Sequence, residues 1–385
     1  MIEYLTKIKE KYKYNSENRK DPKNLKLYKT ISLDLFNENF YNNRACIFNS
    51  FKYDNIYIVY GVKSLNLECY DVIEEKKYTI INNLHTKSFE SCRHFFDKII
   101  SRDLIITSSF DSHVKIINFE KENSHIIIDL FFASNYELII NTAYFINNKI
   151  IVPISNKENG IIELYSMDKN LIGKIEDAGF ILGLNIFYWK KVKKYFIIIA
   201  NVEGVFAYNE NDLTLYKKFI PSFENKIIGF DETIVIEKSN KVILISPCFY
   251  KEFLFFWDFK NGCMISKMTL DSGISDICLW DNNYIFTSFN DFSEFILINT
   301  KINKIEKKYD DKSTIHHRIC GIKAIRHKTK GNYVITSTMT GKLNLHKIYK
   351  SKKLFINPIY MSSIILFFLL FIFYILKNIF KYITI

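Results

Sequence analysis

The sequence has no glutamine, and only 12 of its 385 residues are glycine and 5 are proline. Its turns must therefore use asparagine, aspartate and lysine. The surplus of Ile, Lys, Asn, Phe and Tyr has the character of a nucleotide bias in the genome, so enrichment of one residue type carries little functional weight. The net charge of +12 fits attraction to nucleic acid or an anionic membrane. The net charge alone favours a simpler interpretation, in which the lysines form solvated faces.

Motifs of catalysis and cofactor binding are also missing. The chain has no G-x-x-x-x-G-K-[ST] loop, no G-x-G-x-x-G loop and no G-x-S-x-G turn. The adjacent His316 and His317 would point to opposite sides of a strand, which is poor metal geometry. We expect no catalysis, no metal and no cofactor. Aromatic residues beside lysines superficially suit nucleic acid, but many lie in apolar runs, so we expect core packing and no nucleic-acid partner.

The seven cysteines are scattered, odd in number and free of C-x-x-C pairs. Several lie in apolar runs, as Cys46 and Cys278 do. This pattern predicts buried free thiols in a reducing compartment. The N-terminus is polar and charged, which predicts no signal peptide.

What the sequence does contain is a repeat. The apolar run Phe253–Phe259 includes Trp257-Asp258, and each copy has a very apolar second strand and a third strand that ends in a similar dipeptide. The second residues of these dipeptides are spaced by 47, 48, 43, 49, 41 and 48 residues. A period of this length, in seven copies, predicts a propeller whose units must pack on one another. The dipeptides are Tyr70-Asp71, Ile117-Asn118, Tyr165-Ser166, Tyr208-Asn209, Trp257-Asp258, Ile298-Asn299 and His346-Lys347.

The segment 107–118, Thr-Ser-Ser-Phe-Asp-Ser-His-Val-Lys-Ile-Ile-Asn, resembles the core of a WD repeat, with Asp111 in the turn between second and third strands. Only one Trp-Asp ends a third strand, and the family's Gly-His pair is absent. The resemblance and the period predict an all-β fold, a seven-bladed β-propeller over residues 25–348. The last copy has only three strands before residue 348. We expect Leu25–Phe36 to supply the fourth and close the ring, with Leu25, Leu27, Ile31, Leu33 and Leu35 on one face.

The flanking segments are expected to be distinct. Residues 1–24 form a charged N-terminal segment, and residues 349–358 a basic linker. Residues 359–376 carry no charge, and as an α-helix they would span about 27 Å, which predicts a transmembrane helix before a short tail, 377–385. Lysines on both sides favour a cytosolic propeller. The sequence therefore resembles a tail-anchored, single-pass membrane protein of the endoplasmic reticulum, with the mitochondrial outer membrane as the alternative.

The predicted strand directions place the first-to-second turns on the face from which the tail leaves. These turns are basic, so they either face an anionic membrane or are solvated surface, two interpretations of equal weight. The residues singled out for the membrane surface are Lys190, Lys191, Lys193, Lys194, Arg326, Lys328 and Lys330. The second-to-third turns lie on the other face, and those singled out there for partner binding are Phe110, Asp111, Phe249, Tyr250, Asp291 and Phe292.

The predicted function is a membrane-anchored scaffold that recruits cytosolic proteins to an endomembrane without catalysis. The alternative is guanine-nucleotide exchange on a small GTPase of the secretory pathway. The architecture is similar to the family of propeller exchange factors that is anchored in the endoplasmic reticulum by one C-terminal span. That resemblance implies roles for Lys63 and Asn66 in the first blade, although the family's glycine run is missing here. An RNA-associated scaffold is a third and weaker alternative.

Overall fold

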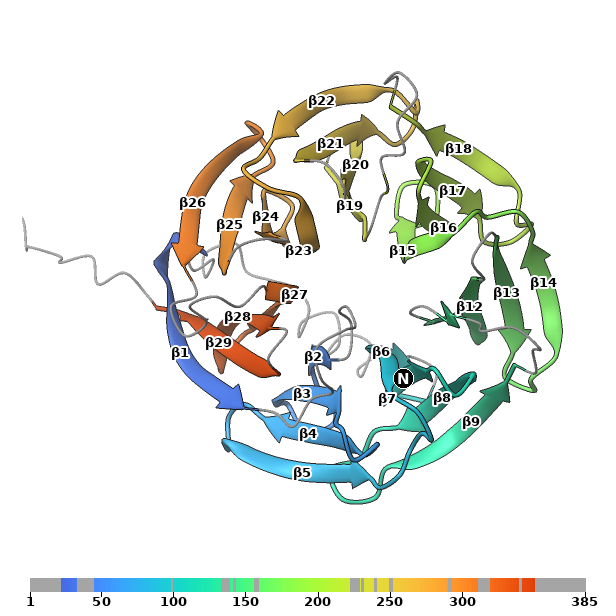
Figure 1. Cartoon of the computed structure of the whole chain (residues 1–385), viewed down its shortest axis with the longest axis vertical. Helices are drawn as coiled ribbons and strands as arrows, with labels where there is room; N and C mark the ends of the chain where they lie inside the picture. The colour runs from blue at the N-terminus through green and yellow to red at the C-terminus, as the bar shows by residue number, and fades with distance from the viewer. Residues whose placement is uncertain are drawn as a thin grey trace, which may run out of the picture.

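The computed structural model describes residues 22–32, 45–97, 100–132, 139–140, 143–155, 159–221, 229, 232–238, 241–248, 252–289, 293–310, 319–338 and 341–349. Within them the chain forms seven antiparallel sheets arranged as blades around a central axis (Figure 1). The seven-bladed β-propeller predicted from the repeat is confirmed.

The first four blades follow one another along the chain. Blade 1 contains β2 (Ala45–Asn49), β3 (Ile56–Gly61), β4 (Leu67–Asp71) and β5 (Lys76–Ile81). Blade 2 contains β6 (Phe89–Asp97), β7 (Arg102–Ser109), β8 (His113–Asn118) and β9 (His125–Phe131). Blade 3 has a divided first strand and contains β10 (Ile139–Ile140), β11 (Tyr144–Ile146), β12 (Lys149–Ser155), β13 (Gly160–Ser166) and β14 (Leu171–Ile175). Blade 4 contains β15 (Ile181–Trp189), β16 (Lys194–Asn201), β17 (Val205–Asn209) and β18 (Leu215–Phe219).

The remaining blades complete the ring. Blade 5 contains β19 (Ile234–Glu237), β20 (Val242–Pro247), β21 (Phe253–Asp258) and β22 (Met264–Thr269). Blade 6 contains β23 (Ile274–Asp281), β24 (Tyr284–Phe289), β25 (Glu294–Asn299) and β26 (Lys304–Asp310). Blade 7 joins β27 (Ile319–His327), β28 (Gly331–Thr338) and β29 (Lys342–Ile348) to β1 (Leu25–Ser32), which follows a short 3-10 helix η2 (Pro22–Asn24).

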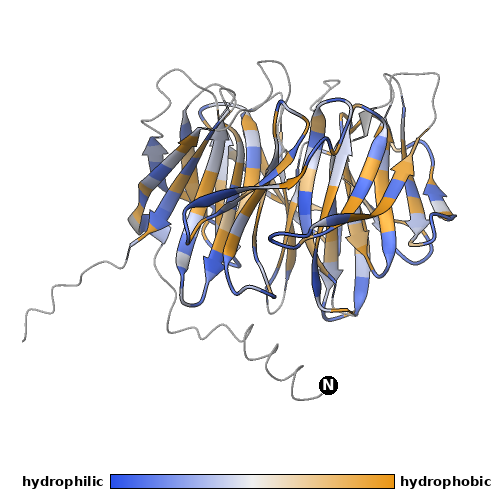
Figure 2. Ribbon diagram, turned by 90° about the horizontal axis from the view of Figure 1, so that it is seen from below, coloured by the Kyte–Doolittle hydropathy of each residue, from blue (hydrophilic) through white to orange (hydrophobic). Residues whose placement is uncertain are grey.

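The core lies between the blades. Each of the seven buried apolar clusters is built from two neighbouring blades. The second and third strands are therefore covered on both sides, which is why they are continuous apolar runs such as the fully buried β3. In β21, Phe255 and Trp257 pack toward blade 4, while Leu254 and Phe256 pack toward blade 6. Figure 2 shows the apolar colouring concentrated along the strands.

The polar residue at the end of a third strand stabilises the turn that follows. The carboxylate of Asp71 accepts from the backbone N–H groups of Ile73 and Glu74, both at 2.9 Å. Asp258 accepts in the same way from Lys260 at 3.0 Å and Asn261 at 3.1 Å. This is the Asx-turn chemistry expected of a chain with few glycines. It explains physically why Asp or Asn recurs in the repeat.

The N-terminal strand closes the ring, as predicted, because β1 pairs antiparallel with β29. Leu25 and Ile31 are buried as expected. The expectation that Leu25, Leu27 and Ile31 share one face is wrong: the pairing register shifts between Leu27 and Lys29, so Leu25 packs toward blade 6 and Ile31 toward blade 1. Leu27 lies before the shift, as Leu25 does, and is 44% exposed. After the shift, Lys29 lies on the same side as Ile31, toward blade 1, where its ammonium pairs with Glu75 at 2.6 Å. Leu33 and Leu35 lie outside the described residues.

The direction of the strands sets the two faces. Backbone bonds join the end of a third strand to the start of the second, as from Val72 N–H to Ile56 O at 2.9 Å and from Phe259 N–H to Val242 O at 3.0 Å. The first-to-second turns and the ends of the third strands therefore share one face, as predicted, which we call the exit face. Leu25 lies opposite Ile348, so the chain enters and leaves the ring at one place.

Among the described residues no helix is long and apolar enough to cross a membrane. Residues 359–376 lie outside that part of the chain.

Candidate functional site: a lysine-lined pocket on the exit face

The residues predicted for the membrane surface form two separate groups on the exit face. Lys190, Lys191 and Lys193 occupy the first-to-second turn of blade 4, with Lys194 at the start of β16, and all four are exposed. Lys328 and Lys330 are exposed in the corresponding turn of blade 7. Arg326 at the end of β27 is half-buried instead. Its guanidinium lies 3.7 Å from the Asp281 carboxylate and 5.6 Å from the ring centroid of Trp280.

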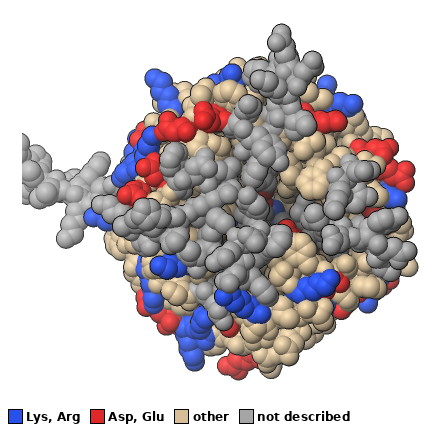
Figure 3. Space-filling view, viewed as in Figure 1, with Lys and Arg blue, Asp and Glu red and all other residues tan. Residues whose placement is uncertain are grey.

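Elsewhere on this face, basic side chains have acidic partners from third-to-fourth turns. Lys52 pairs with Glu120 across blades 1 and 2 at 3.1 Å, and Lys149 pairs with Glu210 across blades 3 and 4 at 2.5 Å. The prediction of basic first-to-second turns did not consider these acidic third-to-fourth turns, which lie on the same face. Figure 3 shows the opposite face of the ring, and there too basic and acidic side chains are mixed around the rim. Basic charge is instead concentrated locally.

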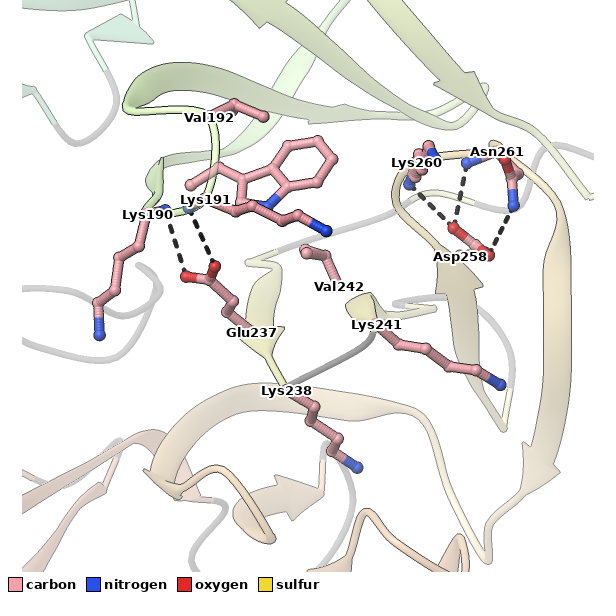
Figure 4. A pocket seen from close by; sticks show the side chains of 11 residues that line it. Lys190, Lys191, Val192, Glu237, Lys238, Lys241, Val242, Asp258, Lys260 and Asn261 are labelled. Carbon is pink, nitrogen blue, oxygen red and sulfur yellow. Dashed lines mark hydrogen bonds between the residues drawn. The ribbon is translucent and has the colours of Figure 1, made fainter.

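The main concentration is a pocket of about 830 Å³ between blades 4 and 5 (Figure 4). Trp189 and Val242, both more than nine-tenths buried, contribute apolar surface to it. Figure 4 shows Lys191 extending toward Val242, whereas Lys190 points away from it. The lysines that line the pocket come from three turns and are Lys190, Lys191, Lys238, Lys241 and Lys260.

Two carboxylates also line the pocket, but their oxygens are occupied by neighbouring N–H groups. Glu237 accepts from the backbone of Lys190 at 3.3 Å and of Lys191 at 3.4 Å, which links blade 5 to the turn of blade 4. Asp258 is bound by its own turn, including the side-chain amide of Asn261 at 2.9 Å. In the described part of the chain, neither carboxylate forms an ion pair with a lysine of the pocket. The lining therefore keeps a surplus of positive charge.

Lys238 is the lysine most affected by its surroundings. Its ammonium donates to the carbonyl of Thr300 at 3.0 Å. Partial burial lowers the pKa of Lys238, and the nearby charge of Lys301 lowers it further. A negatively charged ligand would offset both effects. The arrangement of this pocket suits the binding of an anion, and among the described residues that line it there is no nucleophile paired with a base.

Sequence reasoning found part of this pocket. Lys190 and Lys191 were predicted by charge, and Lys238 and Lys241 lie in a first-to-second turn with a visible lysine excess. Trp189 and Lys260 were missed. The signal for Lys260 was available, since third-to-fourth turns had to lie on the same face.

A second charged cluster lies on the innermost strands and just before β19, and it was not predicted. The Arg93 guanidinium donates to Tyr144 Oη and Glu232, and the Lys323 ammonium lies 3.0 Å from Glu232 and 3.1 Å from Asp276. These residues come from blades 2, 3, 5, 6 and 7, so they connect the ring across its centre. Burial raises the pKa of Asp276 to about 6, against the opposing effect of Lys323. Burial also opposes ionisation of Glu232, but Lys323 and Arg93 outweigh it and lower the pKa of Glu232 to about 2.

On the opposite face, Asp111 belongs to a buried hydrogen-bond network. Its carboxylate, 4% exposed, lies 3.0 Å from His85 Nδ1 and accepts from Thr86 N–H at 2.8 Å. His85 Nε2 lies 2.9 Å from the Thr107 hydroxyl. The ring of His85 thus links the fourth-to-first turn to β7. The WD-repeat family has a Gly-His pair, but in this chain Leu84 and not glycine precedes His85. Asp111 supports the blade, and its predicted role in partner binding stays a prediction.

The other predicted residues are not brought together. Phe110 is half-buried beside Asp111. Phe249, Tyr250, Asp291 and Phe292 lie outside the described residues. In the turn after β3, Lys63 is exposed, and the Asn66 side-chain oxygen accepts from Asn83 N–H at 2.9 Å, so this amide stabilises a neighbouring turn. In the described residues, no group of three or more His, Cys, Asp or Glu could hold a metal ion.

Comparison with known proteins defines the class. No family model matches the sequence, and no curated protein matches it. Solved structures match the fold. A chain of "Crystal Structure of Mitotic Checkpoint Complex" has a TM-score of 0.66 and 9% identity, over 88% of this chain and 95% of that one. A chain of BBS1N in complex with ARL6DN has a TM-score of 0.61 and 10% identity, over 86% and 98%.

Raptor of Chaetomium thermophilum gives 0.62 and 8% identity, over 83% of this chain and 29% of that one. At these identities the likeness establishes the fold alone. The protein is a seven-bladed β-propeller.

Proposed function

We propose that this protein is a non-catalytic scaffold that recruits cytosolic proteins to an endomembrane. The observation that carries the proposal is the pairing of Leu25 with Ile348. It places Leu25 and Ile348, near the two ends of the described ring, on the exit face. We assign partner binding to the opposite face, which carries the second-to-third turns. The propeller neighbours occur in protein complexes, which supports a role in protein interaction.

Membrane attachment is assigned to residues 359–376. Their 18 uncharged residues are long enough for a thin bilayer. Lysines at 347, 350, 352, 353, 377 and 381 flank the stretch and favour a cytosolic propeller. The endoplasmic reticulum is the proposed membrane, with the mitochondrial outer membrane as the alternative.

Carbonate extraction of membranes from cells that express the full chain tests the attachment. Phe367→Arg with Leu370→Arg should move the protein from the pellet to the supernatant, because each arginine near the centre of a span costs about 2.5 kcal/mol of insertion. Phe367→Leu with Leu370→Phe is the matched control and should stay in the pellet. Extraction of the unaltered protein would contradict the proposal.

Nucleotide exchange on a secretory small GTPase remains the alternative function. The turn that contains Lys63 and Asn66 gives it little support, because the Asn66 amide is engaged within the fold. A nucleotide-exchange assay with secretory small GTPases would separate the two, since only an exchange factor should accelerate nucleotide release from a GTPase. Proximity labelling with the intact protein would show whether several proteins lie near it, as expected of a scaffold.

A further inference from the structure

The pocket between blades 4 and 5 differs from the rest of the exit face in how its charge is balanced. Five lysines and two carboxylates line it. Within the described part of the chain, the ammonium groups of Lys190, Lys191, Lys241 and Lys260 have no carboxylate within ion-pair distance. By contrast, Lys52 in the first-to-second turn of blade 1 and Lys149 at the start of β12 each form an ion pair with a carboxylate. The structure thus gathers positive charge here and leaves it uncompensated.

The size and lining of the pocket indicate the kind of anion. Its volume of about 830 Å³ lies in the range of small-molecule sites. Lysine ammonium groups are compact point charges that suit phosphate oxygens. A phosphomonoester carries about −1.5 to −2 charges at neutral pH, so two of them would balance the ammonium groups of Lys191, Lys241 and Lys260. Trp189 and Val242 offer apolar surface to the carbon ring or chain that bears the phosphates.

We propose that this pocket binds a small anion with two or more phosphomonoester groups. Phosphoinositide headgroups and soluble inositol phosphates share this chemistry. The proposal goes beyond the scaffold function and does not depend on membrane insertion. Only a lipid source rests on the proposed function, since it requires the exit face to lie near a bilayer.

Calorimetry on the full chain in neutral detergent tests the proposal, with inositol 1,4,5-trisphosphate as the probe and inorganic phosphate as the comparison. We expect the trisphosphate to bind at least about tenfold more tightly than phosphate, because its charges engage several lysines at once. Lys191→Gln with Lys241→Gln should weaken trisphosphate binding by about tenfold or more. Lys260→Gln alone should weaken trisphosphate binding by a smaller factor. This single variant provides a second test if the double variant fails to fold.

Lys328→Gln with Lys330→Gln is the matched control. It removes the same charge from the same face, at blade 7, and should change the affinity by less than about twofold. Absence of trisphosphate binding, or equal weakening by both double variants, would overturn the proposal.

A second arm identifies the source of the ligand. The same titration is repeated with phosphatidylinositol 4,5-bisphosphate included in the detergent micelles. Competition by the lipid, lost in the pocket double variant, assigns the site to a headgroup. Undiminished trisphosphate binding in the presence of the lipid assigns it to a soluble inositol phosphate. Either result supports the proposal that the pocket binds an anion with two or more phosphomonoester groups.

Discussion

At the scale of single residues, buried polar groups hold the blades in register. His85 is fully buried, and burial lowers its pKa, so the neutral ring can donate from Nδ1 to Asp111 and accept from Thr107 at Nε2. Burial opposes ionisation of Asp111, but the hydrogen bonds from His85 and Thr86 lower the pKa of its carboxyl. The carboxylate therefore stays charged and joins two turns of the blade.

Asp111→Ala should destabilise the protein by about 2–4 kcal/mol, because it leaves the buried His85 nitrogen and the Thr86 and His113 N–H groups without this acceptor. Urea unfolding followed by tryptophan fluorescence measures the change. The matched control is Asp129→Ala. Asp129 is 37% exposed and pairs with His113 at 2.6 Å, so its removal should cost less than about 1 kcal/mol. Equal losses would contradict the structural role of Asp111.

The inner cluster makes a prediction about pH. The pKa of Asp276 is raised to about 6 from the ordinary 3.8, so the folded protein holds this proton at pH values where the unfolded chain has lost it. By linkage, this carboxyl makes stability fall as pH rises from about 4 to about 6. Asp276→Asn removes that loss because the amide stays neutral. Relative to the unaltered protein, the variant should therefore gain about 1 kcal/mol between pH 5 and pH 7.

Glu232 does not disturb this comparison. Its pKa is lowered to about 2, so it stays ionised across the same range. Chemical unfolding of both proteins at pH 5, 6 and 7 gives the difference. A relative loss by Asp276→Asn as pH rises would show that Asp276 acts as an ionised partner of Lys323 over this range.

At the scale of elements, the closing strand is held by few side chains. Leu25 is 5% exposed and packs with the cluster between blades 6 and 7, whereas Leu27 in the same strand is 44% exposed. Leu25→Ala should cost about 2–4 kcal/mol of stability, and Leu27→Ala less than about 0.5 kcal/mol. Thermal unfolding of the two variants checks this difference in burial. A larger loss for Leu27 would contradict the packing of Leu25 between blades 6 and 7.

The fold could be predicted from the sequence because the repeated second and third strands are buried on both sides. Such strands are continuous apolar runs, which are visible in the sequence. The third-strand endings at Asp71, Trp257-Asp258 and Asn299 gave the blade register without any family match. The bulge at Tyr28 could not be predicted, because it depends on how β1 meets the edge of β29. The tail has no counterpart in the described residues and stays a prediction.

The site was less predictable than the fold. The lysine excess at residues 190–194 marked one side of the pocket, but its other side depends on which turns of blade 5 face blade 4. Whether a lysine is compensated depends on contacts between blades, as between Lys52 and Glu120. The inner cluster joins residues as distant as Arg93 and Lys323 through Glu232, and no local pattern reveals such a connection.

At the scale of the whole molecule, both flanking segments begin at one point of the ring, and the lysine-lined pocket opens on the same face. The two faces would therefore have different surroundings if the tail inserts. The exit face would lie near the bilayer, where each nearby lysine contributes about 1 kcal/mol of attraction to anionic lipid, screened by salt. The opposite face would remain accessible to cytosolic partners.

The most direct test of this account is the topology of the full chain in microsomes of the endoplasmic reticulum. One variant carries an N-glycosylation acceptor after Ile385, and a second carries it in the exposed turn that contains Lys63. The account predicts glycosylation of the first variant and none of the second, because only the C-terminal tail would reach the lumen. Glycosylation of the propeller turn, or of neither acceptor, would contradict a cytosolic propeller held in this membrane by its tail.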